Sequence, residues 1–123
     1  MNIDINLYET IKKSGVDIIF SVPCIMLKGL LEIIEEKEEI KHLPITREEE
    51  GVGIAAGAYL GGSIPAILIQ NSGLGNSINA IKSLLELYKI PIVFIIYTTR
   101  SKVAKNKMKN KLIISIEIER IRR

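Results

Sequence analysis

The chain has 123 residues, which is enough for one compact domain with a hydrophobic core but not for two. Hydrophobic residues make up 47% of it and aromatic residues only 5%, so its core must be mainly aliphatic, as is typical of parallel strands covered by helices. The single cysteine excludes an internal disulfide, and the apolar run at 90–97 is shorter than the roughly 20 residues of a membrane-spanning helix. The polar N-terminus does not have the pattern of a secretory leader, so we expect a cytoplasmic protein without membrane contact.

The net charge of +3 is unevenly distributed. Residues 1–99 contain 8 Lys and Arg against 12 Asp and Glu, whereas residues 100–123 contain 9 against 2. We therefore predict a folded domain at 1–99 and a basic tail at 100–123, in which alternating isoleucines at 114–118 predict a possible edge strand. A small nucleic-acid-binding module is an alternative, but no aromatic residue stands among the cations at 100–111 to stack on bases, so we expect no nucleic-acid partner.

Helical and strand patterns alternate along the first 97 residues. A helix capped by Asp4 and ended by Gly15 precedes a strand at 16–22, and a helix with an apolar face at Leu27, Leu30, Leu31 and Ile34 precedes a strand at 40–45. A helix of small residues at 51–62, a strand at 64–70, a loop at 71–76, a helix at 77–88 and a strand at 91–97 follow. This alternation predicts an α/β fold with an open, mostly parallel sheet and helices on both faces.

Loops at the carboxyl ends of the strands are where such sheets bind ligands. The loop at 46–51 holds three consecutive glutamates at a helix start, where carboxylates complement the positive helix end. This structural explanation applies above all to Glu49 and Glu50, whereas Glu48 lies nearest the strand end. The small-residue helix after them indicates that something approaches closely, either another helix or a flat ligand. The loop at 70–77 presents amides and backbone N–H groups, but it lacks the spacing of a dinucleotide or phosphate-loop motif.

Three segments together resemble the pyrimidine-binding domain of thiamine-diphosphate enzymes: SVPCIMLKGLLE, TREEEGVGIAAGAYL and QNSGLGNSINA. In the second, Glu48 leads through a small-residue helix to Gly57, and the third contains a Ser-Gly-x-Gly loop after the next strand. The resemblance covers residues 5–97. Within the family, the chain is similar to decarboxylases of sulfopyruvate and phosphonopyruvate.

The resemblance implies roles for individual residues. Glu48 would be the catalytic carboxylate that bonds a ring nitrogen of the cofactor's aminopyrimidine. The residues expected to contact the cofactor are Glu48, Pro23, Ser72, Gly73, Leu74, Gly75 and Asn76. Candidates for holding an anionic substrate are Arg47, Lys28 and Asn71, and no metal ligand is expected in this chain.

The same resemblance implies a split enzyme. The family's Gly-Asp-Gly motif, which holds magnesium and the cofactor's diphosphate, does not occur in this sequence. We therefore expect a beta subunit that supplies the diphosphate-binding domain and the magnesium, with this chain as the alpha subunit of a hetero-oligomer. The implied reaction is decarboxylation of a small anionic 2-oxo acid, 3-sulfopyruvate, to sulfoacetaldehyde and carbon dioxide in coenzyme M biosynthesis. A phosphonopyruvate-type subunit and a non-catalytic, partner-binding domain of the same fold are the alternatives.

Overall fold

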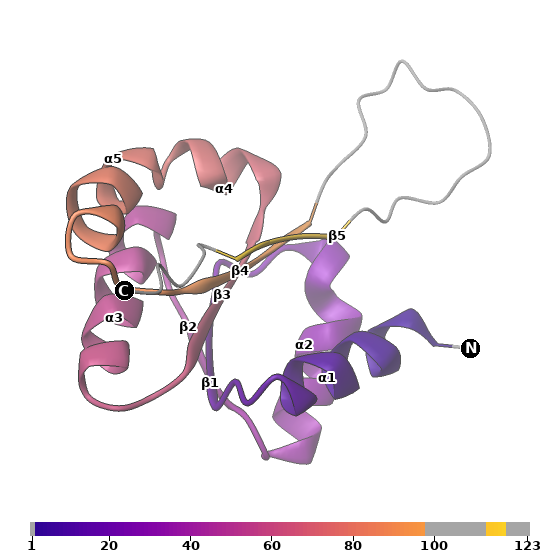
Figure 1. The fold of residues 1–123 in the computed structure, drawn as a ribbon. Coiled ribbons are helices and arrows are strands. Elements are labelled where there is room, and N and C mark those ends of the chain that lie inside the picture. The colour runs from indigo at the N-terminus through magenta and orange to yellow at the C-terminus, as the bar shows by residue number, and fades with distance from the viewer. Residues whose placement is uncertain (1, 98–112, 118–123) are drawn as a thin grey trace.

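The computed structural model describes residues 2–97 and the backbone of residues 113–117, so the basic run at 100–111 lies outside the described residues. Figure 1 shows helices packed on both sides of one sheet. In chain order the elements are α1 (Ile3–Lys13), β1 (Ile18–Ser21), η1 (Ile25–Leu27), α2 (Lys28–Lys37), β2 (Lys41–Pro44), α3 (Glu48–Leu60), β3 (Pro65–Gln70), α4 (Asn71–Gly75), α5 (Ile78–Ala80), η2 (Ile81–Glu86), β4 (Val93–Tyr97) and β5 (Ile113–Glu117). Among the described residues, no helix is both long and apolar enough to cross a membrane.

The sheet has the strand order β2-β1-β3-β4-β5. Strands β1 to β4 are all parallel, and β5 pairs antiparallel with β4, with Ile113 opposite Tyr97. The prediction of an open, mostly parallel sheet is therefore confirmed. Because β1 and β3 are central and each is followed by a helix, the ends of the two strands lie side by side at one edge of the sheet.

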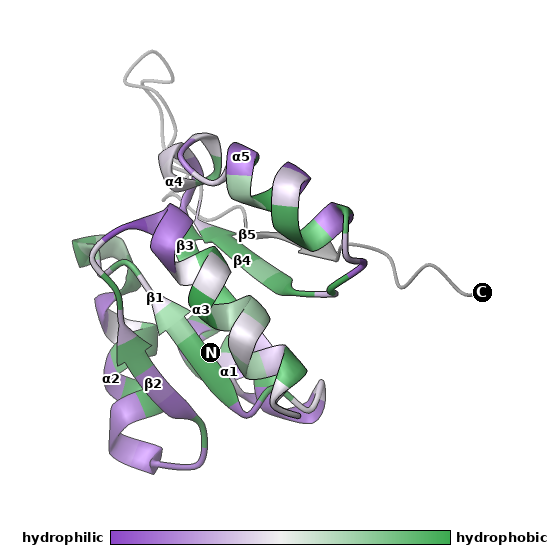
Figure 2. Cartoon of the chain, turned by 90° about the vertical axis from the view of Figure 1, so that its left-hand side faces the viewer, coloured by the Kyte–Doolittle hydropathy of each residue, from purple (hydrophilic) through white to green (hydrophobic). Residues whose placement is uncertain are grey.

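Alternate strand residues point into two hydrophobic clusters, one on each face of the sheet. On one face, α1 and α2 cover Ile19, Leu68 and Ile95. On the other face, α3 and η2 cover Phe20, Ile67 and Phe94. The apolar colouring of β1, β3 and β4 in Figure 2 follows from this burial on both sides. The prediction that helices cover both faces is also confirmed.

The first helix begins earlier than its predicted cap. Asn2, not Asp4, is the N-cap, and its side-chain oxygen accepts a hydrogen bond from the N–H of Asp4 at 2.9 Å. At the other end, Gly15 adopts φ +89°, a left-handed conformation that favours glycine, so the predicted stop is confirmed. Tyr8 and Ile11 are buried on the sheet-facing side of this helix.

The predicted glycine-bearing loop at 71–76 is wrong, because α4 begins immediately after β3. The predicted single helix at 77–88 is instead α5 followed by the π-helical segment η2. Ser77 lies between α4 and α5 and donates a hydrogen bond from Oγ to the carbonyl oxygen of Gly73, 2.8 Å away. Such back-bonding by serine competes with regular helix geometry, which explains why the helical backbone is broken at this point.

Candidate functional site

Two of the predicted loops meet at the carboxyl edge of the sheet. The N–H of Ile45 donates to the carbonyl of Ser21 at 2.8 Å, and the N–H of Val22 donates to the carbonyl of Leu68 at 3.2 Å. These bonds extend the ladder beyond the strands and tie the end of β1 to the ends of β2 and β3. The start of α3 and the start of α4 therefore lie on the same edge.

Glu48 is the first residue of α3, and its half-buried side chain lies directly against the backbone of α4. A Cβ atom on Gly73 would be 2.5 Å from Cγ and 2.7 Å from Oε1 of Glu48. Real Cβ atoms do not come this close to a neighbour, so the carboxylate occupies space that only a glycine at position 73 leaves open.

A second glycine determines where α3 begins. Gly51 is buried in the first turn of α3, and a Cβ atom there would collide with Cδ1 of Ile45. The missing side chain lets the helix start close to the end of β2. Glu48, one turn earlier, is thereby held at the edge of the sheet.

A polar pocket of about 250 Å³ opens beside this carboxylate and is lined by Arg47, Glu48, Glu49 and Asn76. The guanidinium of Arg47 lies 3.6 Å from a carboxylate oxygen of Glu49, and both side chains are largely exposed. The volume is below the roughly 300–1,000 Å³ of pockets that enclose a whole drug-sized ligand. The pocket therefore suits one part of a ligand, with two carboxylates, a guanidinium and an amide to bind it.

The structure brings together only some of the residues predicted for the site. Arg47, Glu48 and Asn76 line the pocket, and Gly73 contacts Glu48. Predicted residues that do not line this pocket are Pro23, Asn71, Ser72, Leu74, Gly75 and Lys28. The ammonium group of Lys28 instead lies 3.7 Å from Glu32 on the surface of α2.

Two residues at this edge were not predicted from the sequence. Glu49 lines the pocket and pairs with Arg47, although only the first glutamate of the run was singled out. Ser77 is fully buried and fixes the carbonyl of Gly73. The sequence offers one signal for Ser77. A serine in a helical segment can donate from its hydroxyl to the carbonyl four residues earlier, which here belongs to Gly73.

The sequence predicts His42 at the surface or on an edge strand, before the strand end and away from the ligand-binding edge. It does lie on the edge strand β2, but its side chain is only 6% exposed. Nε2 lies 2.6 Å from Oγ of Ser21, and Nδ1 lies 3.1 Å from a carboxylate oxygen of Glu35. The side chain is buried because α2 packs beside this strand and supplies Glu35.

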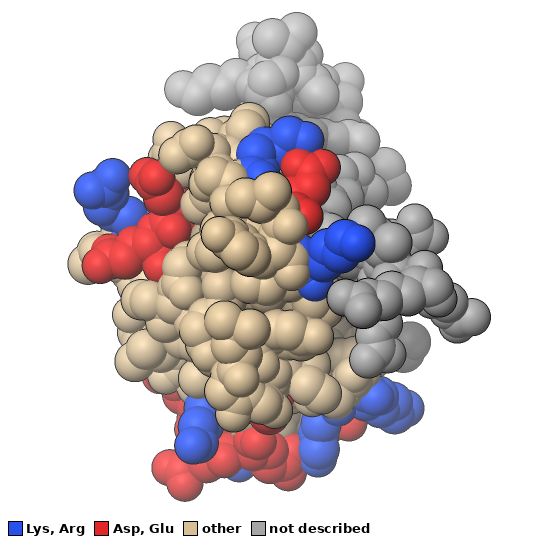
Figure 3. All heavy atoms as spheres, turned by 60° about the vertical axis from the view of Figure 1, so that its left-hand side comes forward, with Lys and Arg blue, Asp and Glu red and all other residues tan. Residues whose placement is uncertain are grey.

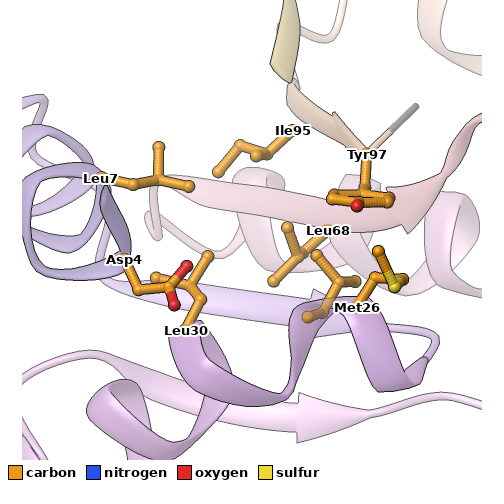
Figure 4. Close-up of a pocket in the computed structure, with 8 residues that line it drawn as sticks. Asp4, Leu7, Met26, Leu30, Leu68, Ile95 and Tyr97 are labelled. Carbon is orange, nitrogen blue, oxygen red and sulfur yellow. The ribbon is translucent and has the colours of Figure 1, made fainter. Parts of the chain in front are cut away.

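A second cavity lies between the sheet and the N-terminal ends of α1 and α2 (Figure 4). Its volume of about 20 Å³ leaves room for water but not for a substrate. Apart from Asp4 and Tyr97, only aliphatic and methionine side chains line it. Burial, and after it an electrostatic contribution from Cys24, raises the pKa of Tyr97. The cavity is part of the core and is not a second site.

Comparison with known proteins identifies the domain. Residues 1–116 match the family model described as thiamine pyrophosphate enzyme, N-terminal TPP binding domain, which extends beyond the 5–97 covered by the motifs. The chain is 56% identical over 96 residues to sulfopyruvate decarboxylase subunit alpha of Methanococcus maripaludis, covering 78% of this chain and 58% of that protein. It is 57% identical over 90 residues to the subunit alpha of Methanocaldococcus jannaschii, covering 73% and 53%. Phosphonopyruvate decarboxylase of Streptomyces viridochromogenes is 41% identical over 81 residues, covering 66% and 20%.

The chain spans little more than half the length of the subunit alpha relatives that it matches. The residues at the carboxyl edge are chemically suited to part of a thiamine-type cofactor. A carboxylate and an amide can bind ring nitrogens and an exocyclic amino group, and the glycine backbone of α4 leaves space beside the carboxylate. The parallel α/β fold, the polar residues at the carboxyl edge and the family match over residues 1–116 all indicate the same kind of domain. The chain belongs to the family of N-terminal TPP binding domains of thiamine pyrophosphate enzymes.

Proposed function

We propose that this chain is the alpha subunit of a thiamine-diphosphate-dependent decarboxylase that converts 3-sulfopyruvate to sulfoacetaldehyde and carbon dioxide in coenzyme M biosynthesis. The observation that carries the proposal is the Glu48 carboxylate, held against Gly73 beside a polar pocket at the carboxyl edge. The names of the relatives support the reaction, since those of Methanococcus and Methanocaldococcus are sulfopyruvate decarboxylase subunits alpha. A cytoplasmic location stays a prediction.

Glu48 is the catalytic residue of this proposal. Thiamine diphosphate, when bound, supplies the carbon nucleophile and the electron sink for decarboxylation. The carboxylate of Glu48 accepts a hydrogen bond from a protonated ring nitrogen of the aminopyrimidine and so holds a proton there. Its half-buried position strengthens that bond, because fewer water molecules compete for the carboxylate.

The other pocket residues have supporting roles. We assign Asn76, Gly73 and Glu48 to the pyrimidine and Arg47 to the anionic end of the substrate, because a guanidinium can bind a sulfonate or carboxylate through two N–H groups. Glu49 competes for the same guanidinium at 3.6 Å, so substrate would displace an exposed and therefore weak ion pair. Pro23, Asn71, Ser72, Leu74 and Gly75 remain proposed contacts from the adjoining loops, whereas Lys28 is the weakest candidate because it pairs with Glu32.

A partner subunit is the second part of the proposal. The relatives' name, subunit alpha, implies a further subunit, and we propose that it carries the diphosphate-binding domain and magnesium. The outer side of α3 provides a surface for it: Gly53 and Gly57 are exposed, and a Cβ atom on either would meet nothing within 4 Å. Ile54 is 40% exposed and Ile78 on the adjoining α5 is 56% exposed. Figure 3 brings this side forward and shows a broad area without charged side chains.

The test is carbon dioxide release from 3-sulfopyruvate with thiamine diphosphate and magnesium. It is measured for the chain alone, for the diphosphate-binding subunit alone and for their mixture. Activity in the mixture alone supports the split enzyme. A stable complex that releases no carbon dioxide from any 2-oxo acid tested would instead establish the alternative, a non-catalytic domain that binds a partner.

The choice between sulfonate and phosphonate rests on sequence identity. The two sulfopyruvate relatives are 56% and 57% identical to this chain, and the phosphonopyruvate relative is 41% identical. We therefore expect a higher kcat/KM for 3-sulfopyruvate than for 3-phosphonopyruvate in the same assay. The reverse order would assign the chain to the phosphonate reaction and leave the role of Glu48 unchanged.

A further inference from the structure

Gly73 is predicted to contact the cofactor, and a side chain at this position would also meet Glu48. A Cβ atom at position 73 would lie 2.5, 2.7 and 2.9 Å from Cγ, Oε1 and Cδ of that glutamate. The close approach involves the three atoms that determine where the carboxylate points. Gly73 itself is buried, so the contact is not a surface coincidence.

The backbone of Gly73 is not free to retreat from this contact. Its carbonyl accepts the hydrogen bond from Oγ of Ser77 at 2.8 Å, and Ser77 is fully buried. The N–H of Ser77 also donates to the carbonyl of Leu74 at 3.0 Å. An added side chain at position 73 would therefore displace the Glu48 side chain, which can rotate, rather than the helix, which is anchored.

We propose that Gly73 is a positioning residue for Glu48: the bare backbone of α4 supports the carboxylate on one side and sets its direction into the pocket. The catalytic part of this inference rests on the proposed function, whereas the steric part does not. In this role Gly73 acts through Glu48, beside its proposed contact with the pyrimidine.

The first experiment follows the position of the carboxylate without any catalysis. The full chain is labelled with ¹³C at the glutamate carboxyl carbon, and the Glu48 resonance is assigned by its loss in Glu48→Gln. Gly73→Ala is expected to shift this resonance. Gly75→Ala is the matched control, since it adds the same methyl group to the same helix where nothing lies within 4 Å. A resonance that is unmoved in Gly73→Ala, or moved equally in Gly75→Ala, overturns the proposal.

The second experiment measures turnover in the complex with the partner subunit. Gly73→Ala is expected to lower kcat by at least 10-fold with a much smaller change in KM, because the misplaced carboxylate affects the reaction and not substrate capture. In the Glu48→Gln background the same change should lower kcat by less than 2-fold, because there is no carboxylate left to position. Equal losses in both backgrounds would mean that Gly73 acts independently of Glu48, and would overturn the proposal.

The two experiments separate this inference from the proposed function. A shifted resonance together with a wild-type complex that does not decarboxylate sulfopyruvate would uphold the positioning of Glu48 and refute the reaction. An active wild-type complex whose Gly73→Ala variant retains both the resonance and the turnover would uphold the reaction and refute the role of Gly73.

Discussion

Oγ of Ser21 lies 2.6 Å from Nε2 of His42, in a part of the sheet where the serine is fully buried and the imidazole is 6% exposed. The other ring nitrogen of His42 is 3.1 Å from Glu35, whose side chain is largely exposed. A hydrogen-bonded chain thus runs from the surface of α2 to the carboxyl end of β1. Both ring nitrogens of a buried histidine have partners, which is the usual condition for burying one.

Ser21→Ala is expected to destabilise the chain by about 1–3 kcal/mol, because it leaves a buried ring nitrogen without its partner. The double variant Ser21→Ala/His42→Leu should recover much of this loss, since both polar groups are then replaced. Urea unfolding of the two variants measures the difference. Additive losses in the double variant would show that the Ser21–His42 bond contributes nothing specific to stability.

Glu48→Gln should lower kcat of the complex by about 10²–10⁴-fold, the range expected when a residue that holds a proton in the reaction is neutralised. The fold should be unaffected, because glutamine has nearly the same shape. Circular dichroism and thermal unfolding provide that control. Glu49→Gln, which removes a neighbouring pocket carboxylate, should have a much smaller effect on kcat. Near-normal turnover in Glu48→Gln would remove Glu48 from the mechanism.

Tyr8 makes the stability of the chain sensitive to alkaline pH. Its fully buried hydroxyl donates to Glu39 at 2.7 Å, and burial, followed by that hydrogen bond, raises the pKa of Tyr8 from 10.0 to about 12. A raised pKa contributes stability that is present below pH 10 and lost as the pH rises toward 12. We expect the free energy of unfolding to fall by up to about 2–3 kcal/mol across this interval.

Tyr8→Phe isolates the contribution of this phenol. Lys12 also loses its charge at alkaline pH, and its hydrogen bond to Glu39 is the first cause of its raised pKa, so part of the decline should remain in the variant. The decline between pH 10 and 12 should nevertheless be smaller than in the wild type. Identical pH profiles of unfolding would show that the Tyr8 phenol ionises in the folded chain as easily as in the unfolded one.

Replacing a crowded glycine of α3 and replacing an uncrowded one should have opposite effects on stability. Gly51→Ala should destabilise the chain by about 1–3 kcal/mol, because the new methyl group collides with Ile45 in a packed region. Gly53→Ala, in the same helix, should stabilise it by up to about 1 kcal/mol, because its methyl group meets nothing and alanine favours helices. Urea denaturation compares them. Equal effects would mean that α3 can move away from Ile45 without cost.

Gly57→Arg tests the uncharged face of α3 as the surface for the partner subunit. The change adds a long charged side chain where the chain leaves open space, so the chain should fold normally but fail to form the complex. Glu36→Arg introduces the same side chain at an exposed position of α2, on the opposite side of the sheet, and should not affect assembly. Size-exclusion chromatography with light scattering measures both. A complex that survives Gly57→Arg would place the partner elsewhere.

Much of the fold was predictable from local patterns. The aliphatic strand segments, the apolar face with Leu30 and Ile34, and the stop at Gly15 each follow from burial and backbone preferences of a few neighbouring residues. The alternation of these elements was sufficient for a parallel α/β sheet with both faces covered. The three motifs together, including the one around Glu48, were sufficient to identify the family of the domain.

The side-chain arrangement at the site and the burial of individual polar residues were decided by contacts between segments distant in sequence. The close approach of Gly73 to Glu48 depends on how α4 is placed against α3. The Ser77 hydrogen bond at the break between α4 and α5 depends on burial that a local pattern does not reveal. The burial of His42 required α2 to cover an edge strand and supply Glu35. A sequence specifies which residues are available to a site, but distances of a few ångströms between their side chains are set only when the helices pack on the sheet.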